Sequence, residues 1–143
     1  MLQVRTREEI FGTVTYSPQE DRFSLESKID KELLLDKKLS APLSMHWILT
    51  IKCNARCPYC YELPYLLKPS DREDTLSLED IENVIEEFGD MFGFRLYLTG
   101  GEPTLNPFAP EIIRLAYEMQ IKTVINSNGI KIPENVYEAI RKY

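Results

Sequence analysis

Three cysteines lie within eight residues, Cys53-Asn54-Ala55-Arg56-Cys57-Pro58-Tyr59-Cys60, and the chain of 143 residues contains no others. A secreted disulfide scaffold needs more pairs and wider spacing, so thiols this close together indicate metal binding. Three thiolates do not complete the four-ligand shell that iron–sulfur clusters and structural zinc sites usually have. The CxxxCxxC spacing therefore predicts a metal site with one open position, where a metal can do chemistry.

Two further stretches carry polar groups and glycines. Leu98-Thr99-Gly100-Gly101-Glu102-Pro103 brings two glycines next to a carboxylate, and Asn126-Ser127-Asn128-Gly129 forms a second polar turn. Glycines suit a position where a ligand must approach the backbone closely. Asn-Gly is also an ordinary turn pair, so the second stretch is equally well explained as a simple turn.

From residue 45 onward, short apolar runs alternate with stretches of helical periodicity. Ser77 and Asp80 form the start of a capping box for the first helix. The expected strands cover residues 45–51, 94–98 and 121–125. The expected helices begin at Ser77, at Asn106-Pro107 and at Pro133, and a long polar loop is expected over residues 61–76. A β-loop-α order repeated in this way requires a parallel sheet with right-handed crossovers. All three motifs follow strands, and ligands bind at the carboxyl ends of parallel strands.

The first 44 residues have a different pattern. Alternating residues over 10–16 and 22–26, on either side of a turn-rich segment at 17–21, predict a β-hairpin. A short helix is expected within residues 28–39. We therefore expect an N-terminal hairpin and helix appendage at residues 1–44, followed by an α/β domain at residues 45–143.

The cysteine loop and the Gly-Gly-Glu-Pro stretch together resemble the motifs of the radical S-adenosylmethionine (SAM) enzymes. The resemblance implies a partial (β/α) barrel whose cysteine loop holds a [4Fe–4S] cluster through three irons, while the fourth iron binds the methionine part of SAM. It implies that the metal ligands are Cys53, Cys57 and Cys60. It further implies that the residues near SAM are Tyr59, Gly100, Gly101, Glu102, Pro103 and Ser127. In this assignment, Tyr59 lies near the adenine, and the Gly-Gly-Glu-Pro stretch receives the SAM ammonium group.

The activity implied by the resemblance is the reductive cleavage of SAM to a 5′-deoxyadenosyl radical, which abstracts a hydrogen from a substrate. The substrate class is open, and the family suggests peptide or cofactor maturation with a reductant such as a ferredoxin or flavodoxin. One βα unit of a barrel takes roughly 30 residues, so we expect about three units, the N-terminal half of the family's core. A partner chain or a second copy would then complete the barrel through its free sheet edge.

Two other interpretations stay open. A zinc site would need an outside fourth ligand, and His46, the single histidine, lies seven residues before Cys53 on the same expected strand. At about 3.3 Å per residue His46 would be roughly 20 Å away, so we expect it to be a packed strand residue. A non-catalytic cluster-binding half-domain, acting with a partner chain or as an electron carrier, is the alternative function. A carrier has no use for the Gly-Gly-Glu-Pro stretch.

Composition excludes several other classes. The net charge is −6 with scattered basic residues, which does not favour nucleic acid binding. No apolar run reaches the length of a membrane span, and the acidic N-terminus is unlike a signal peptide. With 43% hydrophobic and 28% charged residues, we expect a globular cytoplasmic protein.

Overall fold

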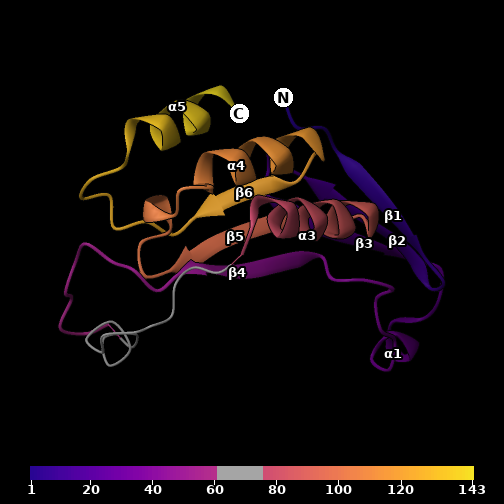
Figure 1. Cartoon of the computed structure of the whole chain (residues 1–143). Coiled ribbons are helices and arrows are strands. Elements are labelled where there is room, and N and C mark those ends of the chain that lie inside the picture. Colours follow the sequence, from indigo (N-terminus) through magenta and orange to yellow (C-terminus); the bar gives the residue numbers. More distant parts are fainter. Residues whose placement is uncertain (61–75) are drawn as a thin grey trace.

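The protein, described by a computed structural model over residues 1–60 and 76–143, has two sheets. An antiparallel sheet near the N-terminus packs beside a parallel sheet that carries the helices (Figure 1). The polar loop expected over residues 61–76 lies, except for Leu76, outside the described residues. In the described part of the chain, no helix is long and apolar enough to cross a membrane.

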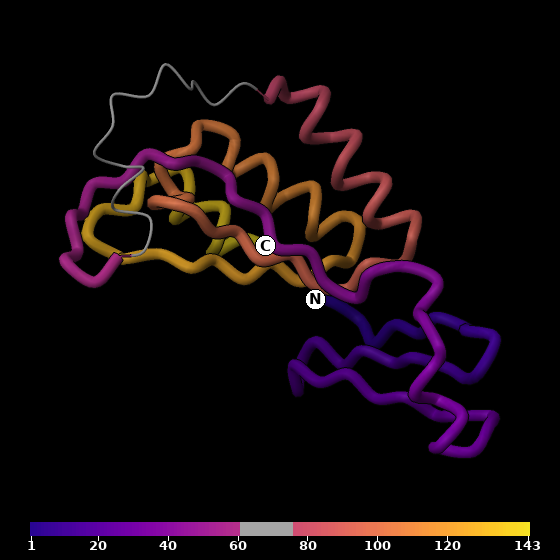
Figure 2. Tube along the Cα trace, turned by 90° about the horizontal axis from the view of Figure 1, so that it is seen from below, coloured from indigo at the N-terminus to yellow at the C-terminus, as the bar shows by residue number. Residues whose placement is uncertain are grey.

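The parallel sheet has the order β4-β5-β6. Its strands are β4 (Ser44–Thr50), β5 (Arg95–Gly100) and β6 (Lys122–Ile125). The connecting elements are α3 (Leu78–Asp90), the short 3-10 helix η1 (Pro103–Leu105), α4 (Ala109–Glu118) and α5 (Glu134–Lys142). Figures 1 and 2 show the helices on one face of this sheet. The predicted α/β class and parallel sheet are confirmed, and three parallel strands fit a partial barrel.

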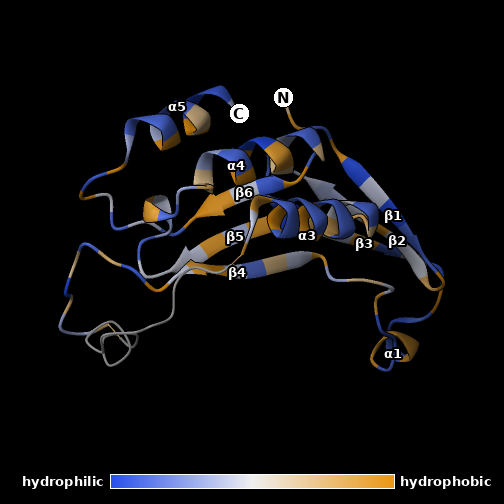
Figure 3. Ribbon diagram, in the orientation of Figure 1, coloured by the Kyte–Doolittle hydropathy of each residue, from blue (hydrophilic) through white to orange (hydrophobic). Residues whose placement is uncertain are grey.

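One core joins the sheet to its helices. Leu96 and Leu98 of β5, at 0% and 1% exposure, contact apolar residues from α3, α4 and α5. The apolar stripes of these helices face the sheet in Figure 3, and their outer faces are hydrophilic. Alternate residues of β5, such as Tyr97, therefore point to the opposite face of the sheet.

The helix starts differ in how well the sequence predicts them. Ser77 accepts a hydrogen bond from the Asp80 backbone, and the Asp80 side chain bonds back, so the predicted capping box is confirmed. The prediction that Asn106-Pro107 opens the second helix is wrong, because α4 begins at Ala109. The Asn106 side chain instead donates to the Leu49 carbonyl (2.9 Å) and accepts from the Phe108 amide (2.8 Å). Asn106 thus ties this connection to β4.

The N-terminal sheet has the order β1-β2-β3. Its strands are β1 (Arg5–Glu9), β2 (Gly12–Ser17) and β3 (Arg22–Ser27), and α1 (Lys31–Leu34) is a single turn. The predicted hairpin corresponds to β2 and β3, which pair antiparallel. Strand β1 was not predicted. It is largely hydrophilic (Figure 3), so it lacks the apolar alternation that reveals a strand.

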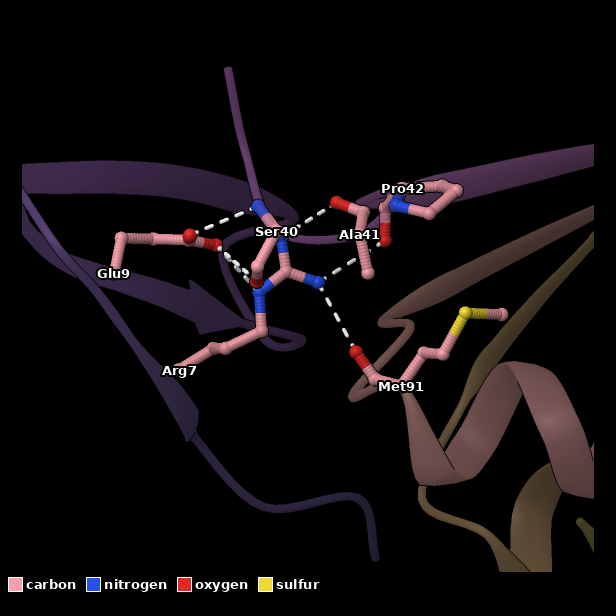
Figure 4. A network of polar contacts seen from close by, with 6 residues as sticks. All are labelled: Arg7, Glu9, Ser40, Ala41, Pro42 and Met91. Carbon is pink, nitrogen blue, oxygen red and sulfur yellow. Dashed lines mark hydrogen bonds and ion pairs between the residues drawn. The ribbon is translucent and has the colours of Figure 1, made fainter. Parts of the chain in front are cut away.

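Strand β1 fastens the N-terminal sheet to the parallel part through two arginines. Arg7 is 6% exposed, forms an ion pair with Glu9 (2.8 Å), and donates to the carbonyls of Ala41, Pro42 and Met91 (Figure 4). Met91 is the C-cap residue of α3. A guanidinium at this position satisfies a carbonyl group at the negative end of the helix dipole.

Arg5 plays the same part at the end of α4. Its Nη1 atom donates to the carbonyls of Met119 (3.3 Å) and Gln120 (3.1 Å), and Met119 is the C-cap residue of that helix. It also donates to the Gly93 carbonyl, at 3.0 Å, just beyond the end of α3. The two sheets are therefore joined by buried and half-buried charged groups that cap two helices.

Candidate cofactor site

The three motifs meet at the carboxyl edge of the parallel sheet. The cysteine loop follows β4, the Gly-Gly-Glu-Pro turn follows β5, and the turn at residues 126–130 follows β6. Backbone hydrogen bonds join the first two loops: the Gly101 amide donates to the Thr50 carbonyl, and the Glu102 amide donates to the Lys52 carbonyl, both at 2.8 Å. The structure therefore brings these loops together as the parallel topology predicts.

The two glycines are required by this contact between loops. A Cβ atom on Gly100 would lie 2.3 Å from the Thr50 carbonyl oxygen, and one on Gly101 would lie 2.3 Å from the Lys52 carbonyl oxygen. Gly100 also has φ +121°, a backbone conformation that other residues rarely adopt. The close approach of a ligand, expected from the sequence, stays a prediction. The structure adds a second reason for glycine at these positions, because the backbone leading into the cysteine loop approaches both of them.

Glu102 is a buried carboxylate with both oxygens in use. Its side chain is fully enclosed, with the residue 1% exposed. Oε1 accepts hydrogen bonds from the Thr104 amide (3.1 Å), the Thr104 hydroxyl (2.6 Å) and the Ser127 hydroxyl (2.9 Å), and Oε2 accepts from the Asn128 amide (2.8 Å). Glu102 therefore connects the turn after β5 to the turn after β6.

These hydrogen bonds determine the charge of Glu102. Burial acts to raise the pKa of the Glu102 carboxyl, but the hydrogen bonds from Thr104, Asn128 and Ser127 outweigh it and hold the pKa below its usual value. The group is accordingly an anion at neutral pH. A cationic ligand at this edge would meet a negative charge whose position is fixed by its neighbours.

Asn128 closes the ring of contacts between the three loops. Its side-chain amide nitrogen lies 2.8 Å from Asn54 Oδ1 and 3.8 Å from Cys53 Sγ, both in the cysteine loop. Sequence reasoning selected Ser127 from this turn and missed Asn128 and Thr104. Both stood in or next to motifs already singled out, but a residue type does not reveal which polar side chain turns toward a neighbouring loop.

The cysteine loop carries three free thiols, all half-buried. A hydrogen bond from the Cys60 amide to the Cys57 carbonyl (3.0 Å) closes a turn in this loop. The Ala55 amide lies 3.4 Å from Cys53 Sγ. Within residues 1–60 and 76–143, no three Cys, His, Asp or Glu side chains are gathered closely enough to hold a metal ion. The thiols thus share one loop without converging. Their chemistry, soft sulfur donors without competing nitrogen or carboxylate ligands, fits an iron–sulfur cluster.

The remaining predicted residues lie at different depths. Tyr59 is 87% exposed, and Pro103 is buried as the first residue of η1. His46 is exposed on β4 and stacks on the Tyr97 ring, with 4.3 Å between ring centroids. The prediction of a packed strand residue at His46 is therefore right about the ring contact and wrong about burial.

Comparison with known proteins identifies the family. Residues 47–143 match the Radical SAM superfamily. Fe-coproporphyrin III synthase of Methanosarcina barkeri is 28% identical over 115 residues, which cover 80% of this chain and 28% of that protein. Mycofactocin maturase MftC of Mycobacterium tuberculosis is 30% identical over 103 residues, which cover 71% of this chain and 25% of that protein.

The fold is similar to that of a solved structure. Streptococcus suis SuiB bound to S-adenosylmethionine matches 99% of this chain and 45% of its own, with a TM-score of 0.72 and 17% identity. SuiB bound to its precursor peptide SuiA gives a TM-score of 0.71 at 15% identity, and covers 99% of this chain and 45% of that chain. The chain thus spans about a quarter of the length of the curated relatives and under half of SuiB. Enzymes of the matched family use a [4Fe–4S] cluster and SAM. Because the family match extends over residues 47–143, the chain belongs to the radical SAM superfamily.

Proposed function

We propose that this chain is the N-terminal part of a radical SAM enzyme, with three βα units of the partial barrel at residues 45–143. The observation that best supports this proposal is that the cysteine loop and the turns after β5 and β6 are hydrogen-bonded to one another at the carboxyl edge of the sheet. In this proposal, Cys53, Cys57 and Cys60 hold the cluster. Once bound, the cluster and SAM would supply a 5′-deoxyadenosyl radical for hydrogen abstraction.

The residues at this edge would bind and orient SAM. Glu102 provides a fixed negative charge, and its contacts hold the turn that contains Ser127. We assign the methionine end of SAM to Gly100–Pro103 and Ser127, and the adenine side to the exposed ring of Tyr59. Because Glu102 already accepts several hydrogen bonds, it would act on the ammonium group mainly through its charge.

We infer that the substrate is a peptide or a cofactor precursor. The likeness of the fold to SuiB, which has been solved with its precursor peptide SuiA, supports the peptide. We further propose that residues 1–44 are a structural cap, because Arg5 and Arg7 tie β1 to the ends of α4 and α3. The alternative role of this region is to bind a peptide that adds a strand to the sheet, at the edge of β3 that is unpaired among the described residues. A cytoplasmic location and a ferredoxin or flavodoxin as reductant complete the proposal.

A second candidate function is a cluster-binding half-domain that is inactive alone. In the described residues, β4 and β6 are each paired on one side only, which favours a partner chain or a second copy beside the sheet. An electron carrier is less consistent with the site, because a carrier needs no fixed negative charge for a cationic ligand beside the cysteine loop.

Anaerobic reconstitution with iron, sulfide and SAM tests the proposal. We expect near-equal amounts of iron and sulfide in the protein and formation of 5′-deoxyadenosine after reduction. The Cys57→Ala variant should lose iron and sulfide, whereas the unaltered protein should retain both. Stoichiometric zinc without sulfide would contradict the proposed cluster. A cluster without any 5′-deoxyadenosine would favour the half-domain.

A further inference from the structure

The side chain of Asn128 is exposed, but hydrogen bonds at both ends of its amide group hold it in one orientation. Its backbone amide donates to Glu102 Oε2 (2.8 Å), and its Oδ1 atom accepts from the Ile130 amide (2.9 Å). A backbone amide can only donate, so the oxygen of the Asn128 side chain must face Ile130. The amide nitrogen must then face the cysteine loop, where it bonds Asn54 Oδ1 (2.8 Å).

This orientation directs an N–H group at the sulfur of Cys53. Asn128 Nδ2 lies 3.8 Å from Cys53 Sγ, and the Ala55 amide lies 3.4 Å from the same atom. Among the cysteines of the described residues, hydrogen bonds to sulfur are found at Cys53 alone. The three thiols are therefore not equivalent, although the spacing of the motif treats them alike.

We propose that Asn128 is a positioning residue that donates a hydrogen bond to the Cys53 sulfur and raises the reduction potential of a cluster bound there. The inference rests on the proposed function, in which Cys53 is a cluster ligand. Hydrogen bonds to ligand sulfur are among the factors that set the potential of an iron–sulfur cluster. An N–H donor stabilises the reduced cluster more than the oxidised one, because the reduced cluster carries more negative charge.

The same contacts connect the sulfur to the SAM side of the edge. Glu102 fixes the backbone of Asn128, and the side chain of Asn128 reaches Cys53, so one residue lies between the buried carboxylate and the cluster ligand. The Asn128 donor comes from the turn after β6, whereas the Ala55 donor belongs to the cysteine loop itself. A change in this turn should therefore alter the electronic properties of the cluster without removing a ligand.

Three variants of the full chain test the inference. Asn128→Ala removes the donor without adding charge. Asn128→Asp is nearly isosteric and keeps an oxygen for the Ile130 amide, but it also removes the donor. Asn126→Asp is the matched control, because it makes the same charge change in the same turn, and within the described residues the Asn126 side chain makes no hydrogen bond to the cysteine loop. The midpoint potential of each reconstituted protein is measured by a redox titration followed by electron paramagnetic resonance, together with iron and sulfide content.

We expect both Asn128 variants to keep their iron and sulfide and to shift the midpoint potential to more negative values, and Asn126→Asp to leave it unchanged. An unshifted potential in Asn128→Ala would overturn the inference. So would loss of iron from both Asn128 variants, since Asn128 would then only maintain the shape of the loop. An equal shift in Asn126→Asp and Asn128→Asp, with none in Asn128→Ala, would show an effect of charge alone and would also overturn it. Absence of iron and sulfide from the unaltered protein would contradict the proposed function itself, a result distinct from these.

Discussion

Replacement of Arg7 by methionine tests whether the N-terminal sheet is an integral part of the fold. Arg7 joins β1 to Glu9, to the segment before β4 and to the end of α3 (Figure 4). Methionine keeps much of the volume of the arginine stem and removes every donor. If residues 1–44 are a structural cap, the whole chain should lose stability when this side chain is altered.

The magnitude follows from burial. The side chains of Arg7 and Glu9 are only 6% and 2% exposed. Among the described residues, Arg7→Met leaves the buried Glu9 carboxylate with hydrogen bonds from Ser40 alone. Three carbonyl groups also lose a donor. Breaking a buried pair from one side costs about 3–5 kcal/mol. For a chain of this size, that loss lowers the midpoint of thermal unfolding by roughly 10–15 °C.

Urea unfolding followed by circular dichroism measures the loss. The matched control is Arg22→Met, because the Arg22–Glu20 pair has a similar length, 2.6 Å, but its side chains are 71% and 57% exposed. Exposed pairs contribute about 0–1 kcal/mol. The double variant Arg7→Met/Glu9→Gln should be less destabilised than the sum of the single changes, because the unpaired charge is removed. If Arg7→Met lowered the free energy of unfolding no more than Arg22→Met does, the conclusion that β1 holds the two sheets together would be refuted.

Four further predictions concern the candidate site, the fall of folding stability at acidic pH and the open edge of the sheet. Glu102→Ala should keep the cluster and weaken SAM binding by roughly 10- to 100-fold, because the loss of a negative charge about 8 Å from the ammonium group removes about 2 kcal/mol at an effective dielectric constant of about 20; unchanged affinity in calorimetry would reject the assignment. Gly101→Ala should lower the free energy of unfolding by about 1–3 kcal/mol through the clash with the Lys52 carbonyl, and equal stability in urea would contradict that contact. Burial acts to raise the pKa of Glu9, but hydrogen bonds from Ser40 and Arg7 prevail and lower it, so its contribution is present above about pH 4.3 and is lost as the pH falls through the lowered pKa. Glu9→Gln should therefore flatten the fall in stability between about pH 5 and pH 2, and a slope equal to that of the unaltered protein would disprove this origin. The 143-residue chain alone should dimerise through its free sheet edge or expose an apolar patch there, and it should cleave SAM slowly; addition of the C-terminal part of the enzyme should raise both SAM affinity and turnover, and a monomer with ordinary enzymatic turnover would contradict the count of three βα units.

Local patterns were sufficient for much of the fold. Strand β4 is a short, nearly continuous apolar run, and such a run is visible without a structure, although His46 and Ile48 on it are exposed. The capping box at Ser77 and Asp80 was equally visible, because a cap is an interaction between residues three positions apart. The location of the site at the carboxyl edge followed from the parallel topology alone.

Strand β1 shows where local patterns fail. Its inward side chains are Arg7 and Glu9, so burial is achieved by pairing two charges and not by apolar residues. A strand of this kind has a polar sequence, and the groups that make it stable come from the segment before β4 and from the end of α3. The start of α4 was misplaced for a similar reason, because Asn106 bonds a carbonyl of β4 as well as its own turn.

The sequence by itself determined the family, the donor types and the alternation of parallel strands and helices after residue 44, because these depend on residue identity and short-range spacing. Only the tertiary structure decided how the motifs act on one another. It showed that Gly100 and Gly101 make room for the carbonyl groups of another loop, that Glu102 is buried and fully bonded, and that Asn128 reaches the sulfur of Cys53. These contacts join residues 25 to 75 positions apart, and which of them form depends on how the sheet brings the strand ends together.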